Sequence, residues 1–392
     1  MTAETAKQFE GLEAQAARVM QVFTNAGYEA VSPAMVQPAG VFLDVIGEAL
    51  RARTYVFTDP DGDELCLRPD LTVPTCRLHL ERHTAALPPA RYCYNGEAFR
   101  FQPQGADPAH PREFRQAGIE CFGSEDREQA EANTVATIMA ALKSAGLNDI
   151  RLRFGDLGMF RALLRSVDIP ERWRQRLRHH FWRPDDFRAE LQRLTQAPAG
   201  LMKSIPAALQ DVLDPDDPAA SETAVQTYLD SEGIDTIGVR GLTEITANLL
   251  AKIADARAQP LPLTISRIIE RYVGLTAPAD QAALIVKDLA REEGVDVADA
   301  LQTYQRRLEL LRRAGVDTAQ AEFSAEFGRT LEYYTGFVFE VYVPSADPLS
   351  PVAGGGRYDS LLKAVGAAGD VPAVGAAIHT ERLLAAVLGE RS

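Results

Sequence analysis

The chain has 392 residues, 46% of them apolar and 24% charged, which is typical of a globular protein of about two domains with a substantial core. Its formal net charge of −14 argues against a nucleic-acid-binding protein, because phosphate contacts need clustered Lys and Arg, although a local basic patch is still compatible with it. No apolar run approaches the length of a membrane span and the N-terminus lacks a signal-peptide pattern, so we expect a cytoplasmic protein.

The first predicted element is an amphipathic helix that ends before Gly27. Its apolar residues recur at helical spacing: Phe9, Leu12, Ala16, Val19 and Phe23. The chain is then predicted to be extended through Pro33 and helical near residues 41–50. A hairpin follows, with Asp61 and Gly62 in its turn.

The segment after this hairpin combines a polar strand face with a helix. In ELCLRPDLT, the residues Arg68, Asp70 and Thr72 share one parity, which predicts a strand that ends in a polar face. Pro74 suits the first turn of a helix that continues to about His83.

Histidines and cysteines show no pattern of a metal site or a disulfide. His79 and His83 lie one helical turn apart, yet no HExxH motif or cysteine pair offers a third ligand, so we interpret them as a solvated helix face. The pair His179 and His180 is interpreted in the same way. The cysteines lack CxxC spacing and are predicted to be reduced core residues: Cys66, Cys76, Cys93 and Cys121. No metal or other cofactor is predicted.

Residues 91–123 are predicted to form two strands joined by a long polar loop. Tyr92 and Tyr94 share a face of the first strand, and Gln116, Gly118 and Glu120 share a face of the second. Gly118 would leave a gap for a small polar ligand, with the Glu120 carboxylate taking an ammonium and the Gln116 amide taking a donor or an acceptor. A strand whose polar side faces water is the alternative interpretation.

A helix ending at Gly146 and a strand over 150–154 come next, and then strand signals almost vanish. We therefore predict a mostly helical insertion over 157–319. Within it, residues 161–193 hold nine arginines against five acidic residues, together with Trp173 and Trp182. A protein-partner surface, an RNA contact and an ordinary amphipathic helix pair all fit this composition.

The last part of the chain returns to strands. Alternating apolar residues over 321–327 and 337–343 predict strands with one buried face, and a strand near 373–378 precedes a helix from Thr380. The pattern continues across the insertion, so we predict one α+β domain from 1–156 and 320–392, an antiparallel sheet packed with helices.

Four stretches, in this order, resemble the catalytic core of histidyl-tRNA synthetase, a class II aminoacyl-tRNA synthetase. In chain order, RPDLT resembles the histidine-binding RPEGT segment, the run FRF…REFRQAGIECFG resembles motif 2, RTLEYY resembles the RGLDYY signature, and PAVGAAIHTERL resembles motif 3. The resemblance implies an antiparallel sheet flanked by helices, a helical insertion domain, and a homodimer built through the region around Pro33. The sequence ends ten residues after Arg382, so no anticodon-binding domain is expected.

The same resemblance implies a histidine-binding site. The matching positions are Asp70, Thr72, Gln116, Glu120, Arg329, Tyr333 and Tyr334. Among them, Glu120 matches the residue that binds the histidine ammonium, and Arg329 matches the residue that neutralises carboxylate charge. A tyrosine of the RTLEYY stretch is expected to line the imidazole pocket.

The nucleotide side departs from the synthetase pattern. Arg100 and Arg382 stand at the motif 2 and motif 3 arginine positions, but the loop FQPQGADPAHPR lacks the acidic residue and the extra arginines that hold ATP. His379 replaces a glycine that lets the nucleotide approach the backbone, so its imidazole is expected to fill that volume. Thr330 replaces another glycine. We therefore expect Arg100, His379 and Arg382 to form a vestigial nucleotide site, and no residue is predicted to be catalytic.

A core that keeps the amino-acid site and loses the ATP site is similar to the ATP phosphoribosyltransferase regulatory subunits. Members of that family assemble with a short-form catalytic subunit for the first step of histidine biosynthesis. The resemblance implies a hetero-oligomer that contains a homodimer, with L-histidine as an allosteric effector and no nucleic-acid or membrane partner. The alternatives are an active ligase that forms histidyl-adenylate and a free histidine-binding module.

Overall fold

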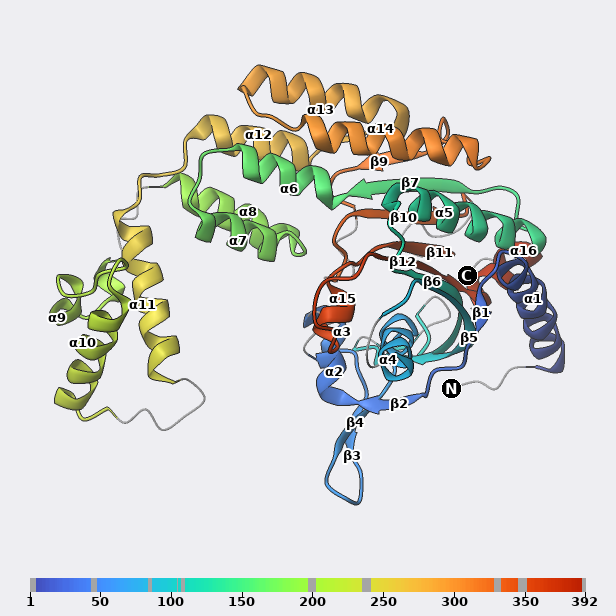
Figure 1. Cartoon of the computed structure of the whole chain (residues 1–392), viewed down its shortest axis with the longest axis horizontal. Helices are drawn as coiled ribbons and strands as arrows, with labels where there is room; N and C mark the ends of the chain where they lie inside the picture. Colours follow the sequence, from blue (N-terminus) through green and yellow to red (C-terminus); the bar gives the residue numbers. More distant parts are fainter. Residues whose placement is uncertain are drawn as a thin grey trace. The chain divides into compact units, whose positions relative to one another are not determined.

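The computed structural model describes most of the chain, which folds as two compact units (Figure 1). The described residues are 5–43, 48–83, 87–103, 105–106, 110–196, 202–234, 241–327, 333–344 and 351–389. Unit 1 comprises Met1–Ser166 with Glu270–Ser392, and unit 2 comprises Val167–Ile269. The insertion predicted over 157–319 is therefore wider than unit 2 at both ends.

Unit 1 is built on a nine-stranded sheet in the order β1-β5-β6-β12-β11-β10-β7-β9-β8. These strands are β1 (Glu29–Ala30), β5 (Ala90–Phe99), β6 (Glu113–Phe122), β7 (Arg151–Asp156), β8 (Thr276–Pro278), β9 (Glu322–Ser324), β10 (Phe337–Tyr342), β11 (Ala353–Arg357) and β12 (Ala373–His379). Among the described strands, only β1 with β5 and β7 with β9 pair in parallel. The predicted α+β class with a mostly antiparallel sheet is confirmed.

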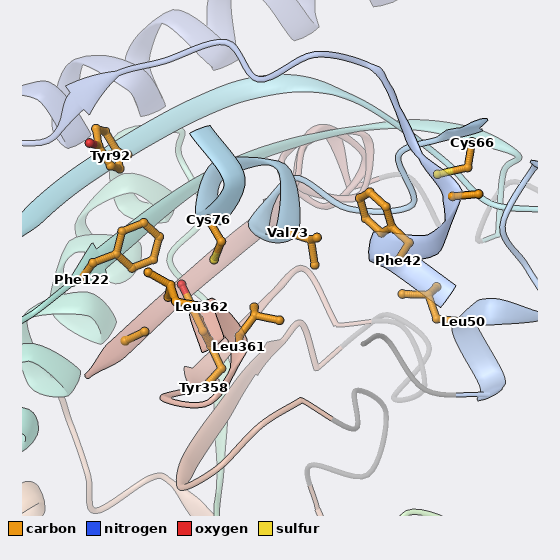
Figure 2. Close-up of a cluster of buried hydrophobic side chains, with 12 residues drawn as sticks. Phe42, Leu50, Cys66, Val73, Cys76, Tyr92, Phe122, Tyr358, Leu361 and Leu362 are labelled. Atoms are coloured by element: carbon orange, nitrogen blue, oxygen red, sulfur yellow. The ribbon is translucent and has the colours of Figure 1, made fainter. Parts of the chain in front are cut away.

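Helices cover both faces of this sheet. On one face, α5 (Arg127–Ser144) packs Ala130 against Cys121 and Val374, and it also contacts α1 (Ala6–Asn25) and α14 (Ala298–Arg313). On the other face, α4 (Thr72–Arg82) and α15 (Leu361–Ala364) bury Cys76 and Leu361 in the core cluster of Figure 2. This unit also contains α6 (Leu157–Ser166), α13 (Ala279–Glu293) and α16 (Thr380–Leu388).

The predicted first helix is confirmed as α1. Its N-terminus carries a capping box, in which the Thr5 hydroxyl accepts from the Gln8 N–H and the Gln8 side chain accepts from the Thr5 N–H. Val19 and Phe23 are fully buried. Gly27 follows with a φ of 85°, a left-handed conformation that ends the helix.

A second, three-stranded sheet of unit 1 contains the predicted hairpin. Its order is β2 (Val36–Pro38), β4 (Glu64–Leu67) and β3 (Val56–Thr58), all antiparallel, and Gly62 has a φ of 94° in the turn. The helix predicted near 41–50 is two short helices, α2 (Ala39–Leu43) and α3 (Glu48–Arg51). Residues 44–47 lie outside the described part of the chain.

Unit 2 is helical, and three of its arginines pair with one carboxylate. Its helices are α7 (Glu171–His180), α8 (Pro184–Thr195), α9 (Ala207–Gln210), α10 (Pro218–Ser231) and α11 (Leu242–Arg257), and α12 (Leu263–Val273) spans its boundary with unit 1. Asp255 accepts from Arg172 Nε and Trp173 Nε1, each at 2.8 Å, and it pairs with Arg176 and Arg193. Trp173 is only 4% exposed, so these contacts favour the amphipathic helix pair over a partner surface at Trp173.

The described residues contain neither a membrane-spanning helix nor a cluster of metal ligands. No helix there is long and apolar enough to cross a membrane. No group of three or more His, Cys, Asp or Glu side chains there is arranged to hold a metal ion.

Candidate ligand-binding site

The residues predicted to share a sheet face lie together on the α4 side of the large sheet. The β5–β6 register places Tyr92 opposite Glu120, and Tyr94 opposite Gly118. Gln116 and Glu120 are 5% and 0% exposed. Their common side is therefore confirmed, and the alternative that this side faces water is wrong.

Glycines on this face make room for the polar side chains beside them. A Cβ on Gly118 would lie 2.5 Å from the Tyr94 hydroxyl, and a Cβ on Gly375 would lie 1.6 Å from Glu120 Oε2. The expectation that Gly118 leaves a gap for a ligand is wrong, because the Tyr94 ring covers it. Gly375 lies opposite Glu120 in the sheet and gives its carboxylate the space that it occupies.

Glu120 is held by two tyrosine hydroxyls. The Tyr94 hydroxyl donates to Oε1 at 2.9 Å, and the Tyr358 hydroxyl donates to Oε2. Burial raises the pKa of Glu120 to about 7, against the opposing effect of hydrogen bonds from Tyr358, Thr72 and Tyr94. Sequence reasoning missed Tyr358, which lies 238 positions from Glu120 in the chain.

The loop that carries Asp70 is not a strand. Strand β4 ends at Leu67 and Thr72 begins α4, so the strand predicted through Thr72 is wrong. Arg68 fixes the loop by donating from Nε to the Glu97 carbonyl at 2.6 Å. Asp70 lies just before the helix, and its Oδ1 accepts from the Val73 N–H of the first helical turn at 3.2 Å.

Two buried oxygens of the predicted site lack a hydrogen-bond partner among the described residues, namely Asp70 Oδ2 and Gln116 Oε1. Asp70 is 4% exposed, and burial raises its pKa. Buried acceptors are normally satisfied, because a lost hydrogen bond costs about 1–3 kcal/mol. These two oxygens are therefore available to the donors of a ligand.

Two tyrosines of the RTLEYY stretch lie at the same site. The Tyr333 ring is 5.8 Å from the Tyr358 ring, and Tyr334 Cε1 is 3.0 Å from the position of a Cβ on Gly356. Burial raises the pKa of both phenols, and the nearby carboxylates of Asp70 and Glu120 add to this effect. Arg329 and Thr330 lie outside the described residues.

The three residues of the predicted vestigial nucleotide site also lie close together. The Phe114 ring is 5.1 Å from the His379 ring and 4.9 Å from Arg100 Cζ. Burial lowers the pKa of His379 well below its usual value, and the neighbouring Arg382 and Arg100 lower it further. Burial also lowers the pKa of Arg100 to about 10. A neutral imidazole therefore fills the space beside Phe114.

Sequence reasoning also missed Glu340 of β10, which lies on the same face. The register places Glu340 opposite Gly354, and Gly354 lies opposite Ala377 of β12. The Tyr342 hydroxyl donates to Glu340 Oε2. Burial raises the pKa of Glu340, although the charges of Arg153 and Arg382 oppose the shift.

The core beneath the site corrects one interpretation of α4. His79 is fully buried, its Nδ1 lies 3.1 Å from the Tyr92 hydroxyl, and its ring is 5.1 Å from that of Phe122. Burial, with smaller effects of His83 and Arg82, lowers its pKa to about 4. The solvated interpretation is wrong for His79, because α4 turns this side toward the sheet. All four cysteines are buried and free, as predicted.

Comparison with known proteins identifies similar chains. The family model of histidyl-tRNA synthetase matches residues 4–235 and 247–383. The ATP phosphoribosyltransferase regulatory subunit of Brucella anthropi is 33% identical over 356 residues, which are 91% of this chain and 92% of that protein. The protein of the same description from Agrobacterium fabrum is 34% identical over 371 residues, which are 94% of this chain and 96% of that protein.

Solved structures resemble the fold of the whole chain. One is an ATP phosphoribosyltransferase regulatory subunit/histidyl-tRNA synthetase from Bacillus halodurans, with a TM-score of 0.68, 20% identity, and coverage of 99% of this chain and 82% of that one. Another is a histidine–tRNA ligase subunit from Alicyclobacillus acidocaldarius, with a TM-score of 0.60, 24% identity, and coverage of 99% and 96%.

Proposed function

The chain belongs to the histidyl-tRNA synthetase-like family of ATP phosphoribosyltransferase regulatory subunits, and we propose that it binds L-histidine to regulate a catalytic partner. In this proposal the partner is a short-form ATP phosphoribosyltransferase, the two proteins act together in the cytoplasm, and the reaction is the first step of histidine biosynthesis. The activity resides in the partner, and this chain contributes no catalytic residue.

The observation that carries histidine binding is the pair of unpartnered acceptors at the site. An ammonium offers three donors, which suit Asp70 Oδ2 and Gln116 Oε1. Glu120 accepts from Tyr94, Tyr358 and Thr72, and a carboxylate has about four acceptor sites, so it can still take one imidazole N–H. This arrangement assigns the ammonium to Asp70 and Gln116, whereas the sequence motif alone suggested Glu120.

The vestigial nucleotide site supports a regulatory role over ligation. The His379 imidazole and the Arg100 guanidinium both lie against Phe114, where they compete with any ring that would stack there. The active ligase is the competing hypothesis, because Arg100 and Arg382 are both retained. Histidine-dependent exchange of pyrophosphate into ATP would establish the ligase and overturn the regulatory role.

The homodimer implied by the resemblance has a suitable surface on the three-stranded sheet. The register places only apolar side chains on its outer face, namely Val36, Pro38, Tyr55, Phe57, Leu65 and Leu67. Val36 and Phe57 are 47% and 41% exposed. Exposed apolar patches rimmed by polar residues mark interfaces, so we propose that a second copy of the chain covers this face.

Calorimetry with L-histidine and with histidinol tests the proposed ligand directly. Histidinol keeps the ammonium and the imidazole but lacks the carboxylate, so we expect it to bind more weakly than histidine and to compete with it. Purification from the host tests the partner, because a short-form phosphoribosyltransferase is expected to accompany the chain. A protein that binds neither compound would contradict the assignment of the site.

A further inference from the structure

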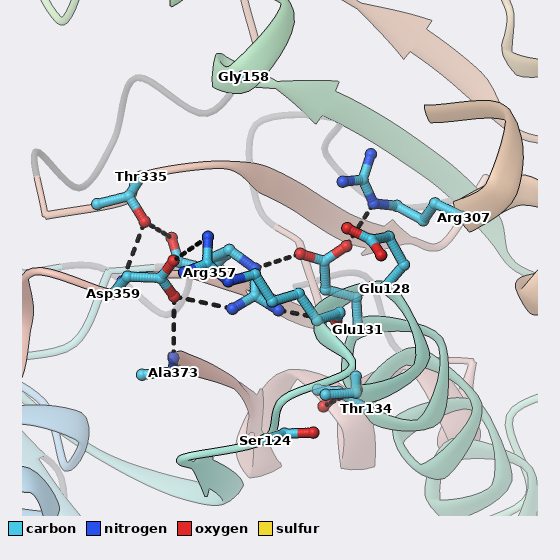
Figure 3. Close-up of polar contacts among 12 residues, drawn as sticks. Ser124, Glu128, Glu131, Thr134, Gly158, Arg307, Thr335, Arg357, Asp359 and Ala373 are labelled. Atoms are coloured by element: carbon cyan, nitrogen blue, oxygen red, sulfur yellow. Dashed lines mark hydrogen bonds and ion pairs between the residues drawn. The ribbon is translucent and has the colours of Figure 1, made fainter. Parts of the chain in front are cut away.

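Buried charges form a continuous chain behind the candidate site (Figure 3). Arg307 of α14 is 4% exposed; it donates from Nε to Glu131 Oε2 and from Nη1 to Asp156 Oδ2 at 2.6 Å. Arg357 of β11 donates from Nε to Oε1 of the same glutamate and from Nη1 to Asp359 Oδ1 at 2.8 Å. Glu131 of α5 is therefore shared by two arginines, and three carboxylates are joined in one network.

One end of this network fixes the segment that carries the site tyrosines. The Asp359 N–H donates to Thr335 Oγ1 at 3.0 Å, and the Thr335 N–H donates to the Arg357 carbonyl at 2.7 Å. Thr335 directly follows Tyr334 in the chain. Asp359 Oδ1 also accepts from the Ala373 N–H at 2.9 Å, where β12 begins. Strand β12 carries the glycine beside the Glu120 carboxylate.

The other end holds the two segments that join unit 1 to unit 2. Asp156 Oδ1 accepts from the Gly158 N–H at 2.7 Å and from the Met159 N–H at 3.3 Å, which caps the first turn of α6. The Tyr272 hydroxyl of α12 donates to the Asp156 carbonyl at 3.4 Å. The chain enters unit 2 after Ser166, at the end of α6, and returns at Glu270 within α12, so Asp156 contacts both helices that lead to unit 2.

The network resists separation of its members. Burial disfavours the charged form of Glu131, but Arg307 and Arg357 outweigh it and hold its pKa below the usual value. Removing one partner of a buried ion pair leaves an uncompensated charge, which is strongly destabilising. A shift at the Thr335 end is therefore passed along the network, because opening it midway would cost more than moving the elements that carry it.

We propose that this network couples ligand binding at the tyrosine site to the α6 and α12 segments that carry unit 2. This inference rests on the proposed histidine binding. Histidine contacts to Tyr333 and Tyr334 fix Thr335, Asp359 transmits the change to Arg357 and Arg307, and Asp156 transmits it to α6. Regulation then reaches unit 2 through charges that contact no ligand themselves.

Hydrogen exchange of the full chain with and without L-histidine tests the coupling. We expect histidine to increase protection at residues 333–344 and also at 157–166 and 270–273. Asp156→Asn keeps an oxygen that can cap α6 but loses the charge that pairs with Arg307. In this variant we expect histidine to bind, with its affinity changed by about fivefold or more, and the response of α6 to be lost.

Asp126→Asn is the matched control, since Asp126 caps α5 and pairs with Arg306 of the same α14 on the exposed surface. It is expected to preserve the α6 response. Thr335→Val tests the network from the end next to the site tyrosines. It replaces Asp156→Asn if that variant does not fold. Histidine binding with no change at 157–166 in the wild type would overturn the coupling alone. Absence of binding would overturn both this inference and the proposed function.

Discussion

At the scale of single residues, Glu120 combines an acidic function with an almost neutral pKa. Two phenol hydroxyls hold it and no cation contacts it among the described residues, so burial dominates and raises its pKa to about 7. The ordinary pKa of a glutamate side chain is 4.5. The free site therefore holds a proton on this carboxyl for part of the time near neutral pH, and a ligand that donates to it must displace that proton.

Histidine affinity is accordingly expected to fall as the pH drops below about 7. The folded pKa of Glu120 lies above its unfolded value, so the free protein keeps the proton in the window between about 4.5 and 7, and binding must release it. Calorimetry at several pH values, in buffers of different ionisation enthalpy, measures both the affinity and the released proton. Glu120→Gln is expected to retain only the pH dependence of the ligand's own imidazole. An identical profile in that variant would remove Glu120 from the binding step.

Asp70→Asn is expected to weaken histidine binding by at least about tenfold and yet to stabilise the free protein. The substitution removes an acceptor of the ammonium, and it also removes a buried carboxylate whose Oδ2 has no partner among the described residues. Relief of that burial is worth about 1 kcal/mol in the free energy of unfolding. Denaturant unfolding and calorimetry on one preparation give both values. Loss of stability together with affinity would indicate a structural role instead.

The buried His79 predicts a loss of stability on acidification. Its folded pKa of about 4 lies below its unfolded value of 6.5, so the unfolded chain binds a proton that the folded chain excludes as the pH falls between these values. We expect the free energy of unfolding to fall by about 2–3 kcal/mol across this window. His79→Asn, which keeps a polar atom near the Tyr92 hydroxyl, is expected to flatten the dependence. An unchanged slope would assign the effect to other groups.

At the scale of elements, the sequence predicted those with a clear period and failed where two patterns overlap. Helix α1 and the strands around Glu120 follow from the spacing of their apolar or polar residues. The segment from Arg68 to Thr72 has strand parity, but α4 begins at Thr72 and Asp70 accepts from the Val73 N–H of its first turn. An Asp placed shortly before a Thr and a Pro is a helix-start signal, which could have been weighed against parity.

Contacts between distant elements were beyond the reach of the sequence. Tyr358 reaches Glu120 across 238 positions, and no local period links the two residues. Asp255 likewise accepts hydrogen bonds from Arg172 and Trp173, which lie 83 and 82 positions away in the sequence. The helical period could place each side chain on a face of its own helix, but only packing determines which faces meet.

The outer face of the three-stranded sheet is the element on which we base a prediction of the oligomeric state. Phe57→Asp places a charge on the outer apolar face, on the edge strand β3, where a second copy is proposed to pack. We expect it to convert a dimer to a monomer, as measured by light scattering on a sizing column. Thr58→Asp, on the opposite side of the same exposed strand, is the control and is expected to remain dimeric. A dimeric Phe57→Asp protein would locate the interface elsewhere.

At the scale of the whole molecule, the order of the motifs predicted which distant residues share a site, and no single motif did so. Residues far apart in sequence, such as Arg100 and His379, were expected at one site because a known core brings such stretches together, and both lie against Phe114. Unit 2 has no such guide. Its arginine-rich segment fitted a partner surface, an RNA contact or a helix pair, and in the structure three of its arginines pair with Asp255.

In the assembled complex, we expect a substitution in this chain to remove inhibition by L-histidine without removing activation of the catalytic subunit. Mixed with a short-form catalytic subunit, the wild-type chain is predicted to support the condensation of ATP with phosphoribosyl pyrophosphate, and L-histidine is predicted to inhibit it. Glu120→Gln is expected to support the same basal rate and to resist histidine by about tenfold or more, because only effector binding is lost. Steady-state rates across a histidine titration measure both effects. A variant that fails to activate would place Glu120 in assembly instead of effector binding.

Position 375 is a glycine, and its identity in homologous chains is a test that needs only their sequences. Even a single methyl group there would lie 1.6 Å from the oxygen of Glu120, so the two positions cannot vary independently. Homologous chains that carry alanine or a larger residue at this point must have moved or abandoned the acid. A survey of this one pair across genomes would therefore sort effector-responsive members of the family from those that serve only as scaffolds.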